Sequence, residues 1–330
     1  MTGVLNALRV KLGWAAQWRR ALRAWDPASG RSRLPGPLKL HLQTVNRCNA
    51  ACLACPYPAA AGRSAPHRMP DDLFREVVGG YGRLGTVESC VLMLQNEPFL
   101  DPALPARVRT ARELLGPRAV LHTVTNGTIL PPDGGAALRR AGLDQLHVSL
   151  DAATPETFAR LRPGHDFHQV RAHAEAFVRA FPRGRVTVKF LQQRENQGEE
   201  KAFLRYWRAR GARVKLGKLT NRAGAVANFA ALRPDRPDPV RRLLAPLLRR
   251  LIPCCPLPFT AACVLSDGRA ILCCHDWGPA QVLGDLAREA PVEVWNGPAV
   301  RRHRTLLWSH RAAESSVCRG CSLAWEFFGE

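Results

Sequence analysis

Residues 38–55 read Leu-Lys-Leu-His-Leu-Gln-Thr-Val-Asn-Arg-Cys-Asn-Ala-Ala-Cys-Leu-Ala-Cys, so an apolar, β-rich run leads directly into three cysteines. The run at 39–45 predicts a strand, and Cys48, Cys52 and Cys55 fall on the loop that leaves it. A structural zinc site needs four closed ligands, usually supplied as two pairs. Three close cysteines without a fourth nearby instead indicate a cubane iron–sulfur cluster with one iron left open.

Strands and helices alternate along the chain from residue 38 onward. Apolar, β-rich runs occur at 39–45, 88–94, 119–124, 144–150, 185–191 and 213–219. Helical patterns separate them at 71–80, 103–115, 134–141, 154–161, 168–181 and 198–210. Units of this kind build a parallel sheet with right-handed crossovers. We therefore predict the α/β class and a partial (β/α)6 TIM-like barrel, whose functional loops follow the carboxyl ends of the strands.

The chain divides into four predicted segments. Residues 1–37 combine a helical apolar periodicity with several arginines, which predicts a basic helix that packs on the protein or lies on a membrane surface. Residues 38–225 form the predicted barrel, and the Pro- and Arg-rich stretch 226–250 is expected to be a joint. Residues 251–330 hold seven of the 11 cysteines and predict a small Cys-rich domain.

Length and composition limit the class of protein. The 330 residues are 46% apolar and 23% charged, as in ordinary globular chains. No run approaches the roughly 20 apolar residues that a membrane span requires, and the N-terminus lacks the apolar core and cleavage site of a signal peptide. We therefore expect a cytoplasmic globular protein of about two domains without a membrane span.

The net charge of +21 has two interpretations. Only six of the 48 Lys and Arg residues are Lys, which is what a GC-rich coding sequence produces. The other interpretation is an anionic partner, because summed positive charge attracts phosphates. No zinc-finger spacing, aromatic-flanked basic motif or RNA-binding signature accompanies the charge, so nucleic acid is not the expected partner.

The motif Cys48-x3-Cys52-x2-Cys55, placed after the first strand of a predicted barrel, resembles that of the radical S-adenosylmethionine superfamily. The resemblance implies that the open iron of a [4Fe-4S] cluster binds the amino and carboxylate groups of S-adenosylmethionine. It also implies reductive cleavage to methionine and a 5′-deoxyadenosyl radical, which abstracts a hydrogen atom from a substrate. A reductant such as flavodoxin or ferredoxin is then expected as a partner.

Later motifs fall where this superfamily has cofactor-binding residues. Residues 95–98, Gln-Asn-Glu-Pro, stand at the place of the family's Gly-Gly-Glu-Pro, so Glu97 is expected to contact the methionine ammonium although both glycines are replaced. The resemblance assigns the ribose and carboxylate of S-adenosylmethionine to Ser149 and Arg162, whose alternatives are a turn-stabilising hydroxyl and a solvated arginine. Asn126 and Asn196, after the third and fifth strands, are expected at the same mouth of the barrel.

The C-terminal cysteines resemble the SPASM domain of radical enzymes. That domain's spacing matches Cys255, Gly268, Cys273, Cys318 and Cys321. No cysteine follows Cys321, so the shorter twitch version with one auxiliary [4Fe-4S] cluster is expected, giving two clusters in all. The resemblance assigns these four cysteines as ligands, with Cys274 the alternative to Cys273. Zinc is the alternative metal, because four thiolates suit it equally well.

Four cysteines lie outside the assigned ligand sets: Cys90, Cys254, Cys263 and Cys274. Cys90 begins an apolar strand and is predicted to be buried. Cys263 and Cys274 are candidate donors of a hydrogen atom to a substrate radical, and simple packing is the alternative for both.

The reaction class depends on the fate of a substrate radical, which ends in dehydrogenation, epimerisation or a crosslink. Peptide-modifying members often carry a leader-binding domain, for which the N-terminal segment is too short. We therefore expect dehydrogenation or epimerisation of a small biosynthetic intermediate, and the arginine-rich surface would suit an anionic one. The alternatives are crosslinking or epimerisation of a ribosomal peptide, transfer-RNA modification and, outside enzymes, a basic zinc-binding nucleic-acid protein.

Overall fold

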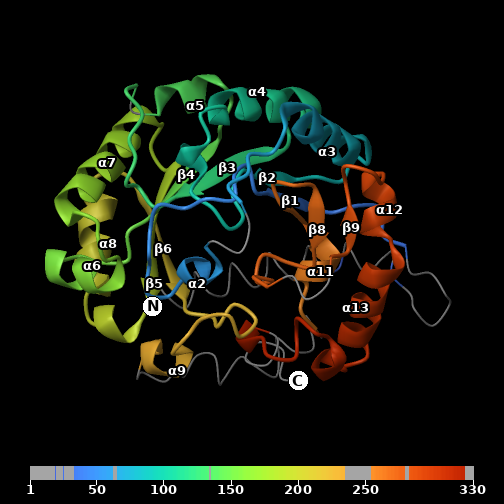
Figure 1. Cartoon of the computed structure of the whole chain (residues 1–330). Coiled ribbons are helices and arrows are strands. Elements are labelled where there is room, and N and C mark those ends of the chain that lie inside the picture. The colour runs from blue at the N-terminus through green and yellow to red at the C-terminus, as the bar shows by residue number, and fades with distance from the viewer. Residues whose placement is uncertain are drawn as a thin grey trace.

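The computed structural model describes Arg19, Trp25 and residues 33–61, 65–133, 135–234, 254–278 and 282–323. Within this part of the chain the strands form one sheet in the order β6-β5-β4-β3-β2-β1-β7-β8-β9 (Figure 1). Most of the predicted N-terminal helix over 1–37 and residues 235–250 of the predicted joint lie outside the described residues.

Six parallel strands follow one another in sequence order and curve into a partial barrel. They are β1 (Lys39–Leu42), β2 (Ser89–Val91), β3 (Val120–Thr125), β4 (Gln145–Ser149), β5 (Val186–Gln192) and β6 (Arg213–Lys218). Each pairs in parallel with the next. The α/β class and the partial barrel are thus confirmed, and each strand lies within one residue of a predicted run.

Helices connect these strands and form an arc around the outside of the barrel (Figure 1). They are α3 (Asp71–Arg83), α4 (Leu104–Leu115), α5 (Ala136–Arg140), α6 (Pro155–Leu161), α7 (Phe167–Ala180) and α8 (Glu200–Ala209). Side-chain caps define two of their starts. Thr154 Oγ1 accepts the backbone N–H of Thr157 at α6, and the Asp166 carboxylate accepts that of Gln169 at α7.

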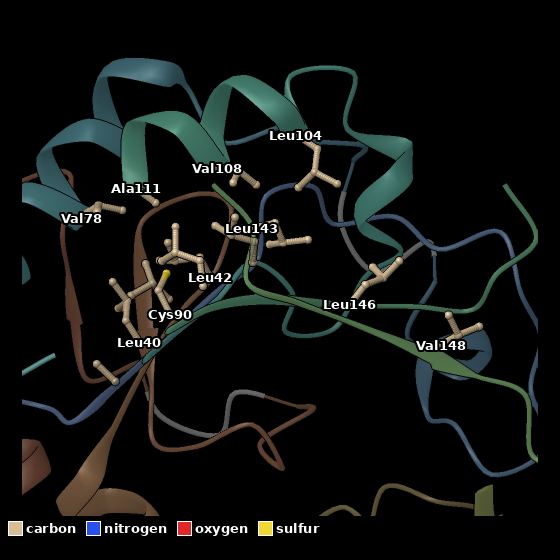
Figure 2. Packing of buried hydrophobic residues seen from close by; sticks show 14 of the residues in the cluster. Leu40, Leu42, Val78, Cys90, Leu104, Val108, Ala111, Leu143, Leu146 and Val148 are labelled. Atoms are coloured by element: carbon tan, nitrogen blue, oxygen red, sulfur yellow. The ribbon is translucent and has the colours of Figure 1, made fainter. Parts of the chain in front are cut away.

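The main core lies between the outer face of the sheet and these helices (Figure 2). Every second strand residue contributes to it, because successive side chains of a strand point to opposite faces. Figure 2 shows the buried strand residues on this face next to the apolar stripes of α3 and α4: Leu40, Leu42, Cys90, Leu146, Val148, Val78, Leu104, Val108 and Ala111. The other strand residues therefore point into the barrel.

The C-terminal segment continues the barrel sheet. Strand β7 (Ala261–Val264) pairs in parallel with β1, and β8 (Arg269–Ile271) and β9 (Gly284–Asp285) add antiparallel strands. Its helices are α11 (Leu257–Thr260), α12 (Pro291–Trp295) and α13 (Pro298–Trp308), with α12 packed against α3 (Figure 1). The sequence does not reveal this continuity, because parallel pairing joins strands more than 200 residues apart.

Short elements complete the described structure. They are α2 (Tyr57–Ala60), η1 (Pro98–Leu100), η2 (Arg194–Asn196), α9 (Phe229–Leu232) and η3 (Ala312–Glu314). None of the helices in the described ranges is both long enough and apolar enough to cross a membrane.

Candidate functional site

The loop after β1 carries Cys48, Cys52 and Cys55, all three partly buried. The backbone N–H of Cys55 donates to the carbonyl of Cys52 (3.1 Å), and that of Tyr57 donates to Cys55 Sγ (3.5 Å). Burial is the main cause that raises the pKa of Cys48 to about 12, and it also raises the pKa of Cys55. These thiols become thiolates only with a compensating positive charge, so the donor set fits a bound iron–sulfur cluster.

Glu97 lies between the cysteine loop and the end of β3. Its side chain is 1% exposed and accepts three hydrogen bonds, from Thr125 Oγ1 (2.7 Å), the Asn126 N–H (2.7 Å) and the Phe99 N–H (3.1 Å). Its own backbone N–H donates to the Arg47 carbonyl (2.8 Å) next to the cysteines. Burial nevertheless raises the pKa of Glu97 to about 7. The carboxyl is therefore fixed in orientation but lacks a charged partner strong enough to keep its pKa low.

Asn126 connects the end of β3 to the cysteine loop. Its Nδ2 donates to Asn49 Oδ1 (2.9 Å) and approaches Cys48 Sγ at 3.9 Å, while its Oδ1 accepts both the backbone N–H and the hydroxyl of Thr128. Sequence reasoning missed Asn49 and Thr128, because neither belongs to a recognisable motif. The contacts place Asn126 directly against the predicted cluster.

Arg162 follows α6 and forms a buried ion pair with Asp151 at 2.6 Å. The Asp151 carboxylate also accepts the backbone N–H of Leu191 (2.7 Å), and Asp151 itself adopts φ +65°. The Nε of Arg162 is buried without a hydrogen-bond partner. Because the Leu161 carbonyl accepts the N–H of Leu53 (2.9 Å), the start of this turn contacts the cysteine loop. Arg162 thus has an unused donor near the three thiols and is not the solvated arginine of the alternative interpretation.

Ser149 and Asn196 occupy different positions relative to this site. Ser149 ends β4, is partly exposed, and forms no side-chain hydrogen bond with the rest of the described chain. Asn196 is fully buried, and its Nδ2 donates to the carbonyls of Asp151 (2.7 Å) and Leu191 (2.8 Å). Its Oδ1 accepts the N–H of Gln193 (2.8 Å). The Asn196 side chain therefore stabilises the loop that carries Asp151. The Ser149 hydroxyl, in contrast, can form a hydrogen bond to a ligand.

The cysteines of the predicted auxiliary cluster all lie in the C-terminal segment that continues the barrel sheet. Cys255, Cys318 and Cys321 are buried and influence one another electrostatically. Burial raises the pKa values of Cys255 and Cys273 well above the usual thiol value. Cys273 lies within electrostatic reach of Cys255, and Cys274 within reach of Cys321. Both remain geometrically possible as the fourth ligand.

No three Cys, His, Asp or Glu side chains in the described ranges converge on a position for a single metal ion. A zinc ion would draw four thiolates to about 2.3 Å from one centre. A four-iron cluster gives each thiolate its own iron and so accepts a wider arrangement.

The two remaining thiols of interest differ in environment. Cys263, on β7 and in register with His41, is 2% exposed and packs in a small apolar cluster with Leu94 and Ile271. Cys274 packs against the same cluster and lies within electrostatic reach of Lys189 on β5. Cys274 is therefore the thiol that lies closer to the basic groups of the barrel interior.

Gln95 and Asn96 stand where the family has two glycines, and the side chains of both form hydrogen bonds. Gln95 Nε2 donates to the carbonyl of Asp276 (2.7 Å), which ties the loop after β2 to the C-terminal segment. Asn96 Oδ1 accepts the N–H of Leu94 (3.1 Å). Nearby, Arg222 Nη1 lies 3.5 Å from His275 Nε2. These contacts join the loop after β2 and the loop after β6 to the C-terminal segment.

Comparison with protein families assigns both halves of this arrangement. The radical SAM superfamily matches residues 42–205, and the SPASM iron–sulfur cluster-binding domain matches residues 254–322. The chain belongs to the radical SAM superfamily and carries a SPASM domain. It therefore uses a [4Fe-4S] cluster with S-adenosylmethionine, together with further iron–sulfur chemistry in the SPASM part. This membership displaces the non-enzymatic zinc-protein alternative.

Curated relatives include enzymes with different substrates. The chain is 30% identical over 195 residues to the GTP 3′,8-cyclase of Vibrio cholerae, covering 58% of this chain and 57% of that protein. It is 26% identical over 225 residues to the PqqA peptide cyclase of Ruegeria pomeroyi, covering 66% of this chain and 57% of that protein. The matches thus span little more than half the length of these relatives.

Solved structures show the same fold at low identity. BtrN, in complex with AdoMet and 2-DOIA, aligns with a TM-score of 0.59 and 18% identity over 86% of this chain and 92% of that chain. SuiB of Streptococcus suis, bound to its precursor peptide SuiA, aligns with a TM-score of 0.65 and 14% identity over 90% and 72%.

Proposed function

We propose that this protein removes a hydrogen atom from a carbon of a small-molecule substrate and completes either a dehydrogenation or an epimerisation. The observation that carries the proposal is the placement of two thiol sets on one sheet with the barrel interior between them. Arg222, on the loop after β6, influences the pKa values of Cys55 in the first set and of Cys274, the alternative to Cys273 in the second set, so it lies near both. When bound, the first cluster and S-adenosylmethionine supply a 5′-deoxyadenosyl radical, and the auxiliary cluster can accept an electron.

The residues around the first thiol set would bind and orient S-adenosylmethionine. The fixed Glu97 carboxylate would accept the methionine ammonium, and the free Nε of Arg162 would donate to the carboxylate. The unpaired hydroxyl of Ser149 would meet the ribose. Asn126 and Asn196 would hold the cysteine loop and the Asp151 loop in place, because their amides are committed to those loops. An external one-electron donor such as flavodoxin or ferredoxin belongs to this proposal.

The two outcomes differ in their hydrogen balance. In a dehydrogenation the substrate gives up one hydrogen atom, then one electron and one proton, and the product is two hydrogens lighter. In an epimerisation a thiol of the chain returns a hydrogen atom to the opposite face, and the thiyl radical left behind takes one electron from the external donor and one proton from solvent. The mass of the substrate is unchanged. Cys274 and Cys263 are the candidate donors, and Cys274 lies closer to the basic groups of the barrel interior.

Maturation of a ribosomal peptide is the second candidate function. It is supported by the similarity to the PqqA peptide cyclase and by the fold shared with SuiB, which was solved with its precursor peptide. In this case the same hydrogen abstraction would act on a residue of the peptide.

The test begins with anaerobically reconstituted protein beside a Cys48/Cys52/Cys55→Ala variant. We expect about eight irons per chain, falling to about four in the variant, as two cubane clusters require. With dithionite and S-adenosylmethionine, the wild type forms 5′-deoxyadenosine and the variant does not. Zinc at both sites, with no iron after reconstitution, would overturn the proposal. Mass spectrometry of product made in deuterated water then separates a loss of two hydrogens from an exchange of one.

A further inference from the structure

The inner face of the barrel differs sharply from its outer face. The inward positions alternate with the aliphatic residues that pack under the helices, and they include three lysines and three histidines: Lys39, His41, His122, His147, Lys189 and Lys215. Parallel (β/α) barrels usually fill this space with branched apolar side chains. The interior of this barrel is instead polar and basic.

The lysines are concentrated here in a way that overall composition does not explain. The chain uses arginine for 42 of its 48 basic side chains and lysine for only six. Three of those six lysines, Lys39, Lys189 and Lys215, occupy inward positions of the barrel strands. A coding bias toward arginine would not place half of the lysines on one inner face.

These side chains face the same space. Lys189 pairs in register with Ser149 on β4 and with Lys215 on β6. The rings of His122 and His147 lie 5.1 Å apart between their centroids. After burial, the charges of Lys189, Lys215 and Lys39 are the next largest causes that lower the pKa of His122 to about 4. All three lysines therefore lie within electrostatic reach of one ring in the interior.

The carboxyl groups near the barrel lie on loops and at strand ends, and two of them, Glu97 and Asp276, are buried without a salt bridge in the described chain. None of the inward positions of β1 to β6 is Asp or Glu. At the strand ends, Asp144 pairs with Arg112 and Asp151 with Arg162. Within the described chain, none of the three lysines forms a salt bridge or a side-chain hydrogen bond.

Two acids of the described chain act on these lysines. Glu88 is the smallest of the influences on the pKa of Lys39, and Asp151 raises the pKa of Lys189 by less than Lys215 and Arg222 each lower it. The histidines do not add to the positive charge, because burial lowers the pKa of His41 to about 3 and that of His147 to about 2. The net charge of the interior is thus carried by the lysines, by Arg213 at the start of β6 and by Arg222.

Such an arrangement costs stability in the free protein. Like charges on neighbouring strands repel one another, and at Lys39 and Lys189 partial burial removes water that would screen them, whereas Lys215 is exposed. The cost shows at Lys189, where burial and the charges of Lys215 and Arg222 lower the pKa to about 8. Lysine binds phosphate as a compact point charge, and converging lysines without a carboxylate match an anion with more than one negative charge.

We propose that the inner face of the barrel, through Lys39, Lys189 and Lys215, binds the phosphate or diphosphate group of the substrate. The assignment of this phosphate group to the substrate rests on the proposed function. Binding of an anion at the three lysines does not depend on that function. The position between the two thiol sets would hold the substrate by its charged end, so that its reacting carbon faces the first set. A phosphorylated small molecule is therefore the substrate class.

The test uses inorganic pyrophosphate as the probe on reconstituted, cluster-loaded protein. Binding is measured by calorimetry and by the rise in Tm that a ligand of the native state produces. In Lys189→Met and Lys215→Met we expect about tenfold or greater loss of affinity, the size of one lost charge-assisted contact. The matched control is Lys201→Met, which removes an exposed lysine on α8 and should bind as the wild type does.

Three results would overturn the proposal. The first is no pyrophosphate binding by the wild type at millimolar concentration, and the second is equal binding by all three variants, which would place the anion on the arginine-rich surface. The third is competition between pyrophosphate and S-adenosylmethionine for binding, together with loss of binding of both in Lys189→Met. This result would assign the lysines to the carboxylate of the cofactor. Iron content and 5′-deoxyadenosine formation by the wild type are measured separately, so failure of the proposed function is distinguishable.

The Lys→Met variants also have a readout of folding. Because each removes an unpaired charge from a repelling group, their Tm without ligand should equal or exceed that of the wild type. Lost binding in a variant of undiminished Tm therefore reports on the anion site and not on misfolding.

Discussion

At the scale of a single residue, the proposed contact of Glu97 with the methionine ammonium predicts that S-adenosylmethionine binding depends on pH. Its pKa of about 7 means that the free carboxyl is protonated below neutral pH. An ammonium group binds the carboxylate and not the acid, so affinity should rise about tenfold per pH unit up to about pH 7 and then level off. Equilibrium dialysis of S-adenosylmethionine across this range measures the effect.

Glu97→Gln is the matched variant. The amide carries no charge, and its NH2 group faces the N–H and O–H groups that donate hydrogen bonds to the Glu97 carboxylate. The affinity for S-adenosylmethionine above pH 7 should therefore fall about ten- to hundredfold. The dependence on pH should disappear with it. A variant that kept the pH profile of the wild type would assign the titration to another group.

Asp151 has a structural role that Asp151→Asn would expose. The substitution keeps an acceptor for the Leu191 N–H and tolerates the positive φ, yet it leaves the buried Arg162 charge without its partner. We expect the free energy of unfolding to fall by about 3–5 kcal/mol. Glu314→Gln, which breaks the exposed pair with Arg311, should leave the free energy of unfolding nearly unchanged. Chemical denaturation of both variants gives the comparison, and equal losses would contradict it.

Gly268 determines the shape of the β7–β8 hairpin, at the scale of one element. It adopts φ +91°, and a Cβ there would lie 3.2 Å from the backbone nitrogen of Ala287. Gly268→Ala should therefore lower the free energy of unfolding by at least about 1–2 kcal/mol. Gly85→Ala is the control, because Gly85 also has positive φ but nothing within 4 Å of its Cβ position. Urea unfolding should show the larger loss at Gly268.

The choice between Cys273 and Cys274 belongs to the loop after β8. The SPASM spacing assigns Cys273, while the structure leaves both near other thiols. We expect Cys273→Ala to lose about four irons per chain and Cys274→Ala to keep them. The reverse result would make Cys273 the spare thiol. Iron and sulfide analysis of both variants after identical reconstitution decides the question.

At the scale of elements, the sequence predicts the barrel well because its signals are local. Each strand is a short apolar run, and Cys48, Glu97 and Ser149 stand at strand ends, which parallel strands bring to one edge. The partners of these residues are harder to foresee. Asn49, Thr128 and Asp151 act through contacts across loops, and no spacing in the sequence encodes such contacts.

The basic interior and the continuous sheet escape sequence analysis for a different reason. Lys39, Lys189 and Lys215 alternate with apolar residues, a pattern that would equally describe a strand with one face in water. Only closure of the barrel turns that face inward. Likewise, the parallel pairing of β7 with β1 depends on chain segments that have no local relation to each other.

For the whole molecule, the continuous sheet predicts a single unfolding transition. Strand β7 is hydrogen-bonded to β1 along its length, and α12 packs on α3. The barrel and the SPASM part should therefore lose structure together. Far-UV circular dichroism and cluster absorbance, followed in the same guanidinium titration, should give coincident curves. Two separated transitions would show that the parts are independent.

The order β1-β7-β8 also bears on electron transfer between the two proposed clusters. The cysteine loop leaves the carboxyl end of β1, whereas β8 runs antiparallel to β7, so the Cys273 loop leaves at the opposite edge. Neighbouring strands are held about 4.8 Å apart by their hydrogen bonds. Within the described residues both loops leave one hydrogen-bonded sheet, so we expect the distance between the two proposed iron–sulfur centres to be fixed by that sheet. The rate of electron transfer between them should therefore be independent of solvent viscosity, because no domain motion is needed to bring the two centres together.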